Sequence, residues 1–271
     1  MDEPRILVTN DDGIESPGFR ALYEALSAVG DVVAVAPYAD QSAVGRAMSD
    51  DVVVHEYDLG YAIEGTPADC VVAGLESLAP DADLVVSGCN EGANLGQYVL
   101  GRSGTVSAAV EAAFFDVPAL AVSMYVPEDE WGEGTTDRED YAVACDAASY
   151  LARDAVETMQ AGRDADHRTA AFGPADYLNV NAPMASHVSD PEAVEMTVTE
   201  PSELYDMGAA HEDGVVQLTD RVWRRMKDGD IPDPEGTDRR ALVDGKVSVS
   251  PLTAPHTVTE IKHLDDLAAT Y

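Results

Sequence analysis

The sequence predicts an α/β fold with a mainly parallel sheet, on the basis of three observations. Short apolar runs typical of buried strands recur along the first 185 residues of the 271-residue chain. Segments with apolar residues at helical spacing separate these runs, as in β-α-β units, whose two strands are parallel. Past residue 185 the pattern changes to short extended segments joined by turns. We therefore expect an α/β catalytic core over residues 1–185 and a C-terminal extension over residues 186–271.

The first β-α-β unit lies at the N-terminal end of the chain. Residues 6–8 form an apolar run that stops abruptly at the polar residues 10–13, as a buried strand ending in a loop does. Ser16 then favours the start of a helix because it can act as the N-cap, and Pro17 loses no hydrogen bond at the first helical position. Residues 31–36 are the second buried strand.

The remaining elements of the core follow from the same signals. Thr66 before Pro67 repeats the cap-then-proline pattern, and buried strands again alternate with helices. The sequence predicts one or two strands over 48–63, a helix over 66–78, a strand over 83–87, a helix over 106–115, a strand over 118–124, a helix over 141–160 and a strand over 177–180. Loops over 37–46, 88–105 and 128–140 join them.

The extension has a different character. Its segments 197–200, 215–223 and 242–250 are predicted to be extended or hairpin elements outside the parallel sheet, with no crossover helices between them. Such short elements cannot easily bury both faces alone, so we expect the extension to be an oligomerisation arm. The protein is then at least a dimer, either a homodimer or a homotetramer.

Composition excludes several classes of partner. Acidic residues number 51 against 16 basic ones, which gives a formal net charge of −35, yet 45% of the residues are hydrophobic and well patterned. Disorder therefore does not explain the charge, and adaptation to concentrated salt does. Such a field repels nucleic-acid polymers and anionic membranes. No apolar run approaches the ~20 residues of a membrane helix and no signal peptide precedes the first strand, so we expect a cytoplasmic protein.

Oxygen ligands converge at one edge of the predicted sheet. The loops after the first, second and third buried strands leave this same edge and bring Asp11, Asp12, the Ser42 hydroxyl and the Asn90 amide oxygen. Adjacent aspartates converge where the backbone turns, which Gly13 permits. These donors suit one hard divalent cation, Mg²⁺ or Mn²⁺. We expect Asp11 to lie on an exposed loop. An Asx-type turn without a ligand explains the tetrapeptide 10–13 equally well.

A phosphate cradle is predicted beside these ligands. The stretch 88–105 is rich in glycine, whose backbone N–H groups can approach a ligand closely. Ser103, Gly104 and Thr105 stand at the N-terminus of the helix over 106–115, where exposed amides and the helix dipole favour an anion. A metal beside a phosphate cradle is the arrangement of a phosphoesterase.

Five separated motifs, in order, resemble the SurE (survival protein E) family of metal-dependent nucleotidases. They are ILVTNDDG with SPGF downstream, VAPYADQSAVG, GTPADCV, VVSGCNEGANLG and SGTVSAAVEAA. The resemblance implies a Rossmann-like three-layer α/β/α sandwich whose C-terminal extension is often exchanged between subunits. It also implies hydrolysis of nucleoside monophosphates at the phosphomonoester bond, by 5′-nucleotidase and possible 3′-nucleotidase activity.

The resemblance also assigns roles to residues. Asp11, Asp12, Ser42 and Asn90 occupy the metal-ligand positions of the family, and Asn94, Ser103, Gly104 and Thr105 fall in its phosphate-binding motifs. Asp11 is the nearest candidate for a general base, while Asn94 and the 103–105 segment would stabilise developing charge. Family members commonly have acidic and histidine residues after a segment matching 249–252. Here residues 253–256 are TAPH, so no catalytic role transfers to His256.

Two other functional classes account for some of the same residues. A non-catalytic nucleotide sensor would keep the metal and the cradle without productive geometry. A phosphatase that forms an aspartyl-phosphate is disfavoured, because such enzymes usually need two aspartates separated by one residue and Asp11 and Asp12 are adjacent. Arg46 and Arg102 flank the predicted site and suit either phosphate binding or a surface salt bridge.

We predict that stability and substrate association rise together with salt. At a charge of −35, self-repulsion loosens the compact state and repels an approaching phosphomonoester. Salt at ~1 M shortens the Debye length to ~3 Å and suppresses both effects between exposed charges. Thermal unfolding and activity measured from low to molar KCl should therefore both improve, and a melting temperature that stays flat or falls would contradict the prediction.

Overall fold

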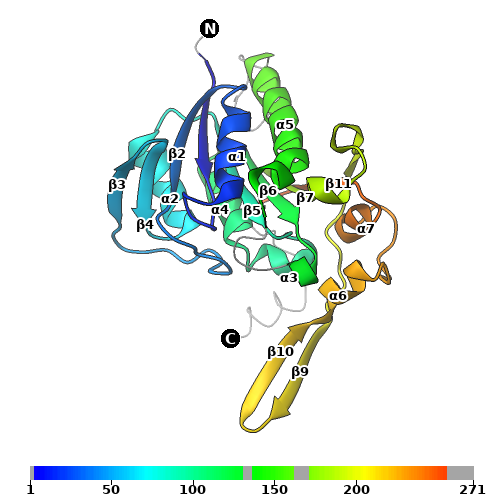
Figure 1. Cartoon of the computed structure of the whole chain (residues 1–271). Coiled ribbons are helices and arrows are strands. Elements are labelled where there is room, and N and C mark those ends of the chain that lie inside the picture. Colours follow the sequence, from blue (N-terminus) through cyan, green and yellow to red (C-terminus); the bar gives the residue numbers. More distant parts are fainter. Residues whose placement is uncertain (1–2, 131–135, 162–170, 255–271) are drawn as a thin grey trace, which may run out of the picture.

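The computed structural model describes residues 3–130, 136–161 and 171–254, and it confirms the α/β fold (Figure 1). The described residues form a nine-stranded sheet and a separate two-stranded hairpin. The strands of the sheet are β1 (Arg5–Thr9), β2 (Asp31–Pro37), β3 (Val53–Tyr57), β4 (Gly60–Glu64), β5 (Leu84–Glu91), β6 (Ala119–Tyr125), β7 (Tyr177–Pro183), β8 (Met196–Val198) and β11 (Val247–Leu252). Their order is β3-β4-β2-β1-β5-β6-β7-β11-β8. The six strands from β4 to β7 are parallel to one another, while β3 is antiparallel to β4.

Helices cover both faces of this sheet. On one face, α1 (Pro17–Leu26) and α5 (Ala142–Ala161) pack on a core that includes Phe19 and Leu22. On the other face, α2 (Pro67–Ala73), its π-helical continuation (Gly74–Leu78) and α4 (Gly104–Phe114) enclose a second core. These are the three layers of an α/β/α sandwich, as predicted (Figure 1). Short 3₁₀ turns occur at Glu128–Glu130, Arg138–Tyr141, Ala185–His187 and Pro191–Ala193.

The predicted helix starts are confirmed by their caps. The Ser16 hydroxyl accepts the Phe19 N–H, and Pro17 opens α1. Thr66 and Asp69 form a reciprocal capping box ahead of α2, in which each side chain accepts the backbone N–H of the other residue. Each cap satisfies N–H groups that the helix leaves without intrahelical partners.

The third predicted strand is longer than its apolar run indicates. Strand β5 continues to Glu91, and its pairing with β6 shifts register between Ser87 and Asn90. A bulge of this kind changes the direction of the side chains that follow it, and bulges are common beside functional sites. Asn90 therefore lies on the end of a strand rather than in a loop.

The extension departs from prediction in two respects. Strand β11 pairs antiparallel with β7, and β8 pairs parallel with β11, so two segments predicted to lie outside the sheet belong to it. The expected absence of helices is also wrong, because α6 (Arg221–Lys227) and α7 (Asp238–Val243) lie between the extended segments. Strand pairing across a long stretch of chain leaves no local sequence signal. Strands β9 (Met207–Glu212) and β10 (Val215–Asp220) do form a hairpin, which projects from the body of the protein (Figure 1).

A buried polar cluster joins the extension to the core. The carboxylate of Asp238 accepts the Gly96 N–H at 2.7 Å and the Ser202 N–H at 3.0 Å. Arg239 is fully buried and donates to Ser202 Oγ at 3.1 Å, while its guanidinium lies 3.6 Å from Asp233. Removal of one member would leave a buried charge without its partner, which is strongly destabilising. The cluster thus fixes α7 against the chain segment that leads from β5 to α3 (Gln97–Leu100).

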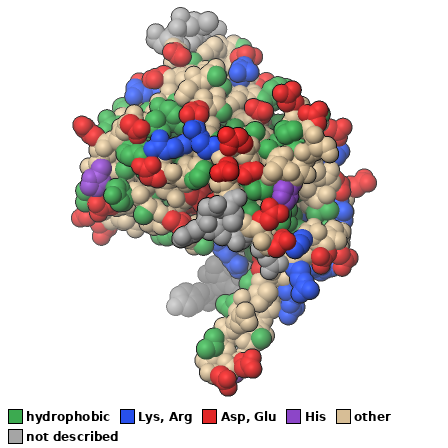
Figure 2. All heavy atoms as spheres, in the orientation of Figure 1, with side chains coloured by type: hydrophobic (Ala, Val, Ile, Leu, Met, Phe, Trp, Pro, Cys, Tyr) green, Lys and Arg blue, Asp and Glu red, His purple; other side chains and the backbone are tan. Residues whose placement is uncertain are grey.

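The surface agrees with the composition. Figure 2 shows Asp and Glu side chains spread over the visible face, with fewer Lys and Arg among them. All three cysteines, Cys70, Cys89 and Cys145, are free and buried. In the described part of the chain, no helix is long and apolar enough to cross a membrane. Trp131, in the predicted acidic loop, and His256 lie outside the described residues.

Candidate active site

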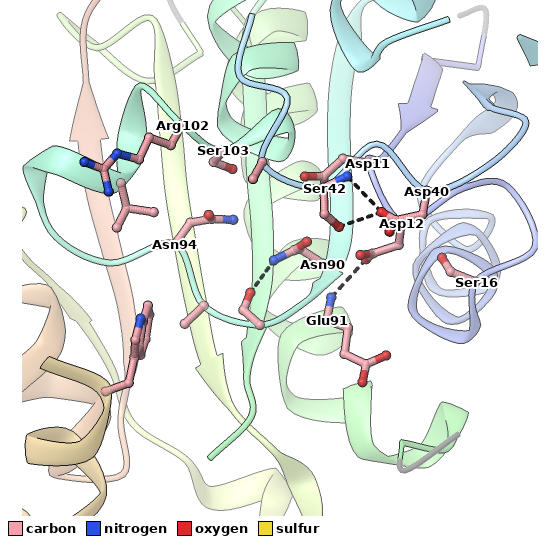
Figure 3. A pocket seen from close by; sticks show the side chains of 15 residues that line it. Asp11, Asp12, Ser16, Asp40, Ser42, Asn90, Glu91, Asn94, Arg102 and Ser103 are labelled. Atoms are coloured by element: carbon pink, nitrogen blue, oxygen red, sulfur yellow. Dashed lines mark hydrogen bonds between the residues drawn. The ribbon is translucent and has the colours of Figure 1, made fainter. Parts of the chain in front are cut away.

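The candidate site lies at the point in the sheet where successive strands of the chain are added first on one side of β1 and then on the other. Strand β1 has β2 on one side and β5 on the other, so the loops that follow these strands diverge at the carboxyl edge. In open α/β sheets such a switch point is the usual place for a ligand. A pocket of about 700 Å³ opens here (Figure 3). Its lining comprises Asp11, Asp12, Ser16, Asp40, Ser42, Ala43, Asn90, Glu91, Gly92, Ala93, Asn94, Val99, Arg102, Ser103 and Trp223.

Asp11 is buried at the centre of the site. Only 3% of its surface is exposed, so the prediction that it lies on an exposed loop is wrong. The Thr105 hydroxyl donates to Asp11 Oδ1 at 2.6 Å. Burial raises the pKa of the Asp11 carboxyl above its ordinary value, although the hydrogen bonds from Thr105 lower it in part. The side chain is thus held in one orientation, with Oδ2 left for another ligand.

Asp12 stands beside it in a similar environment. Its Oδ2 accepts the backbone N–H of Glu91 at 2.9 Å, which joins the loop after β1 to the end of β5. Burial, followed by repulsion from the Asp11 carboxylate, raises the pKa of Asp12 well above its ordinary value. Two neighbouring carboxylates with raised pKa values are the environment that a bound divalent cation would compensate.

Asn90 and Ser42 border the same space. The Asn90 Nδ2 group donates to the Gly92 carbonyl, so the amide oxygen is turned away from that bond toward the aspartates (Figure 3). The Ser42 backbone N–H and hydroxyl both donate to Asp40 Oδ1, at 2.8 and 2.6 Å. Ser42 Oγ therefore keeps its lone pairs for a ligand. Asp40, which the sequence analysis did not single out, orients this hydroxyl.

The four predicted metal ligands are compatible with a hard cation. Asp11 and Asp12 offer carboxylate oxygens, and Ser42 and Asn90 offer neutral oxygens, with no sulfur or imidazole among the four. Among the described residues, no group of three or more His, Cys, Asp and Glu side chains could hold a metal. The four predicted ligands combine two carboxylates with neutral oxygens, and Mg²⁺ and Mn²⁺ accept such a mixed set together with water and phosphate.

The N-terminus of α4 forms the adjoining wall. Ser103 is its N-cap, and the Ser103 hydroxyl accepts the Val106 N–H at 3.0 Å. Gly104 follows, and a Cβ at this position would lie 2.7 Å from Asp11 Cβ and 2.8 Å from Asp11 Oδ2. The helix can approach the carboxylate this closely only because residue 104 is glycine. An anion in the pocket beside this contact would meet both the helix dipole and a cation held by the aspartates.

Asn94 is held by residues from three other elements. Its Nδ2 donates to Ser123 Oγ at 2.9 Å and, more weakly, to Thr105 Oγ1 at 3.4 Å. Its backbone N–H donates to Asn181 Oδ1 at 2.7 Å, and its carbonyl accepts from Asn179 Nδ2 at 2.9 Å. The contact with Thr105 is the weaker of the two, so the amide hydrogen that makes it is the one available to a substrate oxygen.

Asn179 and Asn181, which hold the backbone of Asn94, are residues that sequence reasoning missed. Both are fully buried on β7, and they stand two residues apart on one face of the strand. Two buried amides at that spacing in an otherwise apolar strand are a signal that could have identified them, because buried polar groups must find partners. Glu91 and Trp223 line the pocket without having been predicted to do so.

The two arginines predicted to flank the site lie in different pockets. Arg46 lies 3.3 Å from the Glu111 carboxylate, with its guanidinium over the Phe114 ring at 4.7 Å, and it lines a different pocket. Arg102 does line the candidate site, and its guanidinium lies 5.3 Å from the centre of the Tyr98 ring. Arg102 is the one basic side chain among the described residues of this pocket.

Together these features define an α/β protein that has an oxygen-rich pocket beside a helix N-terminus. The chain belongs to the SurE family, whose model "Survival protein SurE" matches residues 6–205. It is 61% identical to "5'-nucleotidase SurE" of Haloarcula marismortui, over 100% of this chain and 96% of the relative. It is 60% identical to "5'-nucleotidase SurE" of Halobacterium salinarum, over 100% of this chain and 99% of the relative.

A solved structure supports the same assignment. The SurE protein from Aquifex aeolicus superposes with a TM-score of 0.72 at 28% identity, covering 98% of this chain and 99% of that one. The fold similarity therefore extends through the extension, beyond the residues that the family model matches. The two archaeal relatives come from halophiles, which supports the prediction of adaptation to concentrated salt.

Gly104→Ala should weaken cation binding sharply without unfolding the protein. The added Cβ must displace Asp11, while alanine itself favours the helix. Gly101→Ala is the matched control, since nothing lies within 4 Å of its Cβ position. Calorimetric titration with Mn²⁺ should show affinity lost in the first variant and kept in the second. Equal affinities would show that the contact between α4 and Asp11 does not shape the site.

Proposed function

We propose that this chain is a divalent-cation-dependent 5′-nucleotidase that hydrolyses nucleoside monophosphates to nucleoside and phosphate. The observation that best supports the proposal is the adjacent pair Asp11 and Asp12, of which Asp11 is buried in direct contact with the N-terminal segment of α4. Cation and phosphate ligands thus adjoin in one pocket at the switch point of the sheet. The names of the relatives agree with this chemistry.

One cation per subunit, Mg²⁺ or Mn²⁺, would be held by Asp11, Asp12, Ser42 and Asn90. When bound, it supplies Lewis-acid polarisation of the phosphoryl group and makes water a better nucleophile at neutral pH. The protein contributes the rest of the geometry. Thr105 and the Glu91 N–H fix the two carboxylates, and Asp40 fixes the Ser42 hydroxyl.

The phosphoryl group would lie in the pocket beside the aspartates, at the N-terminus of α4. Asn94, the Ser103 hydroxyl and the amide of Gly104 donate to its oxygens and offset the charge that develops during bond cleavage. Asp11 is the nearest candidate to accept the proton of the attacking water. Thr105 is buried and its hydroxyl donates a hydrogen bond to Asp11, so it acts as a positioning residue.

Asp11→Asn should abolish most phosphate release while leaving the fold intact. Asparagine has the same shape and can still accept from Thr105, but it removes a charge that the cation requires. The loss in kcat/KM should be at least about 100-fold, as for other groups that stabilise transition-state charge. Asp81→Asn is the control, because Asp81 is a surface partner of Arg5.

The assay is phosphate release from a panel of 5′- and 3′-mononucleotides with Mg²⁺ or Mn²⁺, beside a chelated sample. Turnover that persists in chelator would refute the role of the cation. Binding of nucleotide without turnover under any metal would instead identify a nucleotide sensor. Near-full activity in Asp11→Asn would refute the central assignment.

We further propose that the extension, residues 186–271, mediates assembly into a homodimer or homotetramer. The β9–β10 hairpin projects from the body of the protein, and its apolar residues Val215, Val216 and Leu218 are 67%, 55% and 70% exposed (Figure 1). An isolated two-stranded hairpin is at best marginally stable in water. A second chain that covers these residues would supply the missing burial.

Val216→Asp combined with Leu218→Asp should shift the protein toward monomer. The two residues share one face of β10, and charge on that face opposes burial. Gln217→Asp is the control, because it adds a charge between the same two positions on the strand but on the opposite face. Sedimentation in molar KCl should give at least a dimer for the wild type. A compact wild-type monomer at working concentration would contradict the proposal.

A further inference from the structure

The pocket extends beyond the cation and phosphate ligands. In Figure 3, Arg102 lies at the opposite end from Asp12 and Asp40, with Asn94 and Ser103 between them. The lining of the pocket also includes Val99 and Trp223. A volume of about 700 Å³ is in the range of pockets that enclose a whole small ligand, and a phosphate alone would leave much of it empty.

Trp223 comes from outside the parallel core. It is on α6, and it lies beyond residues 6–205, which the family model matches. It packs half-buried against a cluster that includes Ala93 and Leu95, on the segment that follows β5. The extension therefore places an aromatic ring in the wall of a pocket whose acidic residues all come from the core.

A second aromatic ring packs against Trp223 and fixes its orientation. It stacks on Tyr125, at the end of β6, with ring centres 6.4 Å apart and planes inclined by 19°. An indole held in this way loses little conformational entropy when a planar ligand packs against its remaining surface. Arg102, the pocket's one basic residue among those described, adds hydrogen-bond donors at the end remote from Asp12.

We propose that Trp223 is the stacking surface for the nucleobase of the substrate, so that the extension supplies a specificity determinant of the site. The proposal rests on the proposed nucleotidase function. Stacking on an aromatic ring accepts any base, and purines cover more of the indole than pyrimidines do. Purine nucleotides therefore depend on Trp223 more than pyrimidine nucleotides.

The test compares AMP with ribose 5-phosphate, which has the same phosphate and sugar but no base. Trp223→Ala and Trp223→Leu should lower the ratio of kcat/KM for AMP to that for ribose 5-phosphate by about fivefold to 150-fold, mainly through KM for AMP. Trp223→Phe should restore much of the ratio. Tyr150→Leu, on exposed α5 surface, is the control and should leave the ratio unchanged.

A binding measurement gives a second readout that does not depend on turnover. The chain has two tryptophans, so Trp131→Phe leaves Trp223 as the only indole. AMP added to this variant in chelator should quench its fluorescence with saturation, whereas ribose 5-phosphate should not. Because Leu keeps an apolar side chain in the cluster, Trp223→Leu supplies the comparison if Trp223→Ala does not fold.

The outcomes separate this proposal from the one on which it rests. A wild type that releases no phosphate from either compound would refute the nucleotidase, while the quenching experiment would still test Trp223. An unchanged ratio in Trp223→Leu, or equal losses on AMP and ribose 5-phosphate, would overturn the stacking role. The same holds if AMP and ribose 5-phosphate give equal quenching.

Discussion

The whole site depends on the enclosure of two neighbouring carboxylates at the end of one strand. Asp11 and Asp12 are held close together at the end of β1, where burial disfavours charge on both. The hydrogen bonds that they accept, from Thr105 and from the Glu91 N–H, fix their positions without neutralising them. A divalent cation bound to both carboxylates would offset their charge and stabilise the pair. Two carboxylates fixed in a setting that disfavours their charge are thus the feature that suits this pocket to a cation.

The surrounding fold explains why the pair stays in place. The β5 bulge directs Asn90, Gly104 lets α4 approach Asp11, and the asparagines of β7 hold the backbone of Asn94. Further out, Asp238 accepts the N–H of Gly96, so the extension supports the same segment of chain. Core and extension therefore meet at the site through hydrogen bonds to backbone, which tolerate little displacement.

The parts of the fold that could be predicted are those with a local physical cause. Ser16 and Thr66 identified helix starts because caps act within one turn, and apolar runs identified the parallel strands. Asp11, Asp12, Asn90 and Ser103 were identifiable because each lies at or just after the end of a strand or just before a helix. Strands β8 and β11, the buried Arg239 and the ring of Trp223 were not, because their positions depend on contacts with residues far away in the chain. The burial of Asp11 was missed for the same reason, since α4 covers it.

The most direct test of this account is the anomalous diffraction of a crystal grown with Mn²⁺ in molar salt. The account predicts one strong manganese peak per subunit, bounded by the carboxylates of Asp11 and Asp12 and by the side-chain oxygens of Asn90 and Ser42. The peak should vanish in Asp11→Asn crystals grown under the same conditions. A peak elsewhere in the wild type, or well-ordered empty carboxylates at saturating Mn²⁺, would contradict the claim that this pair is the cation site.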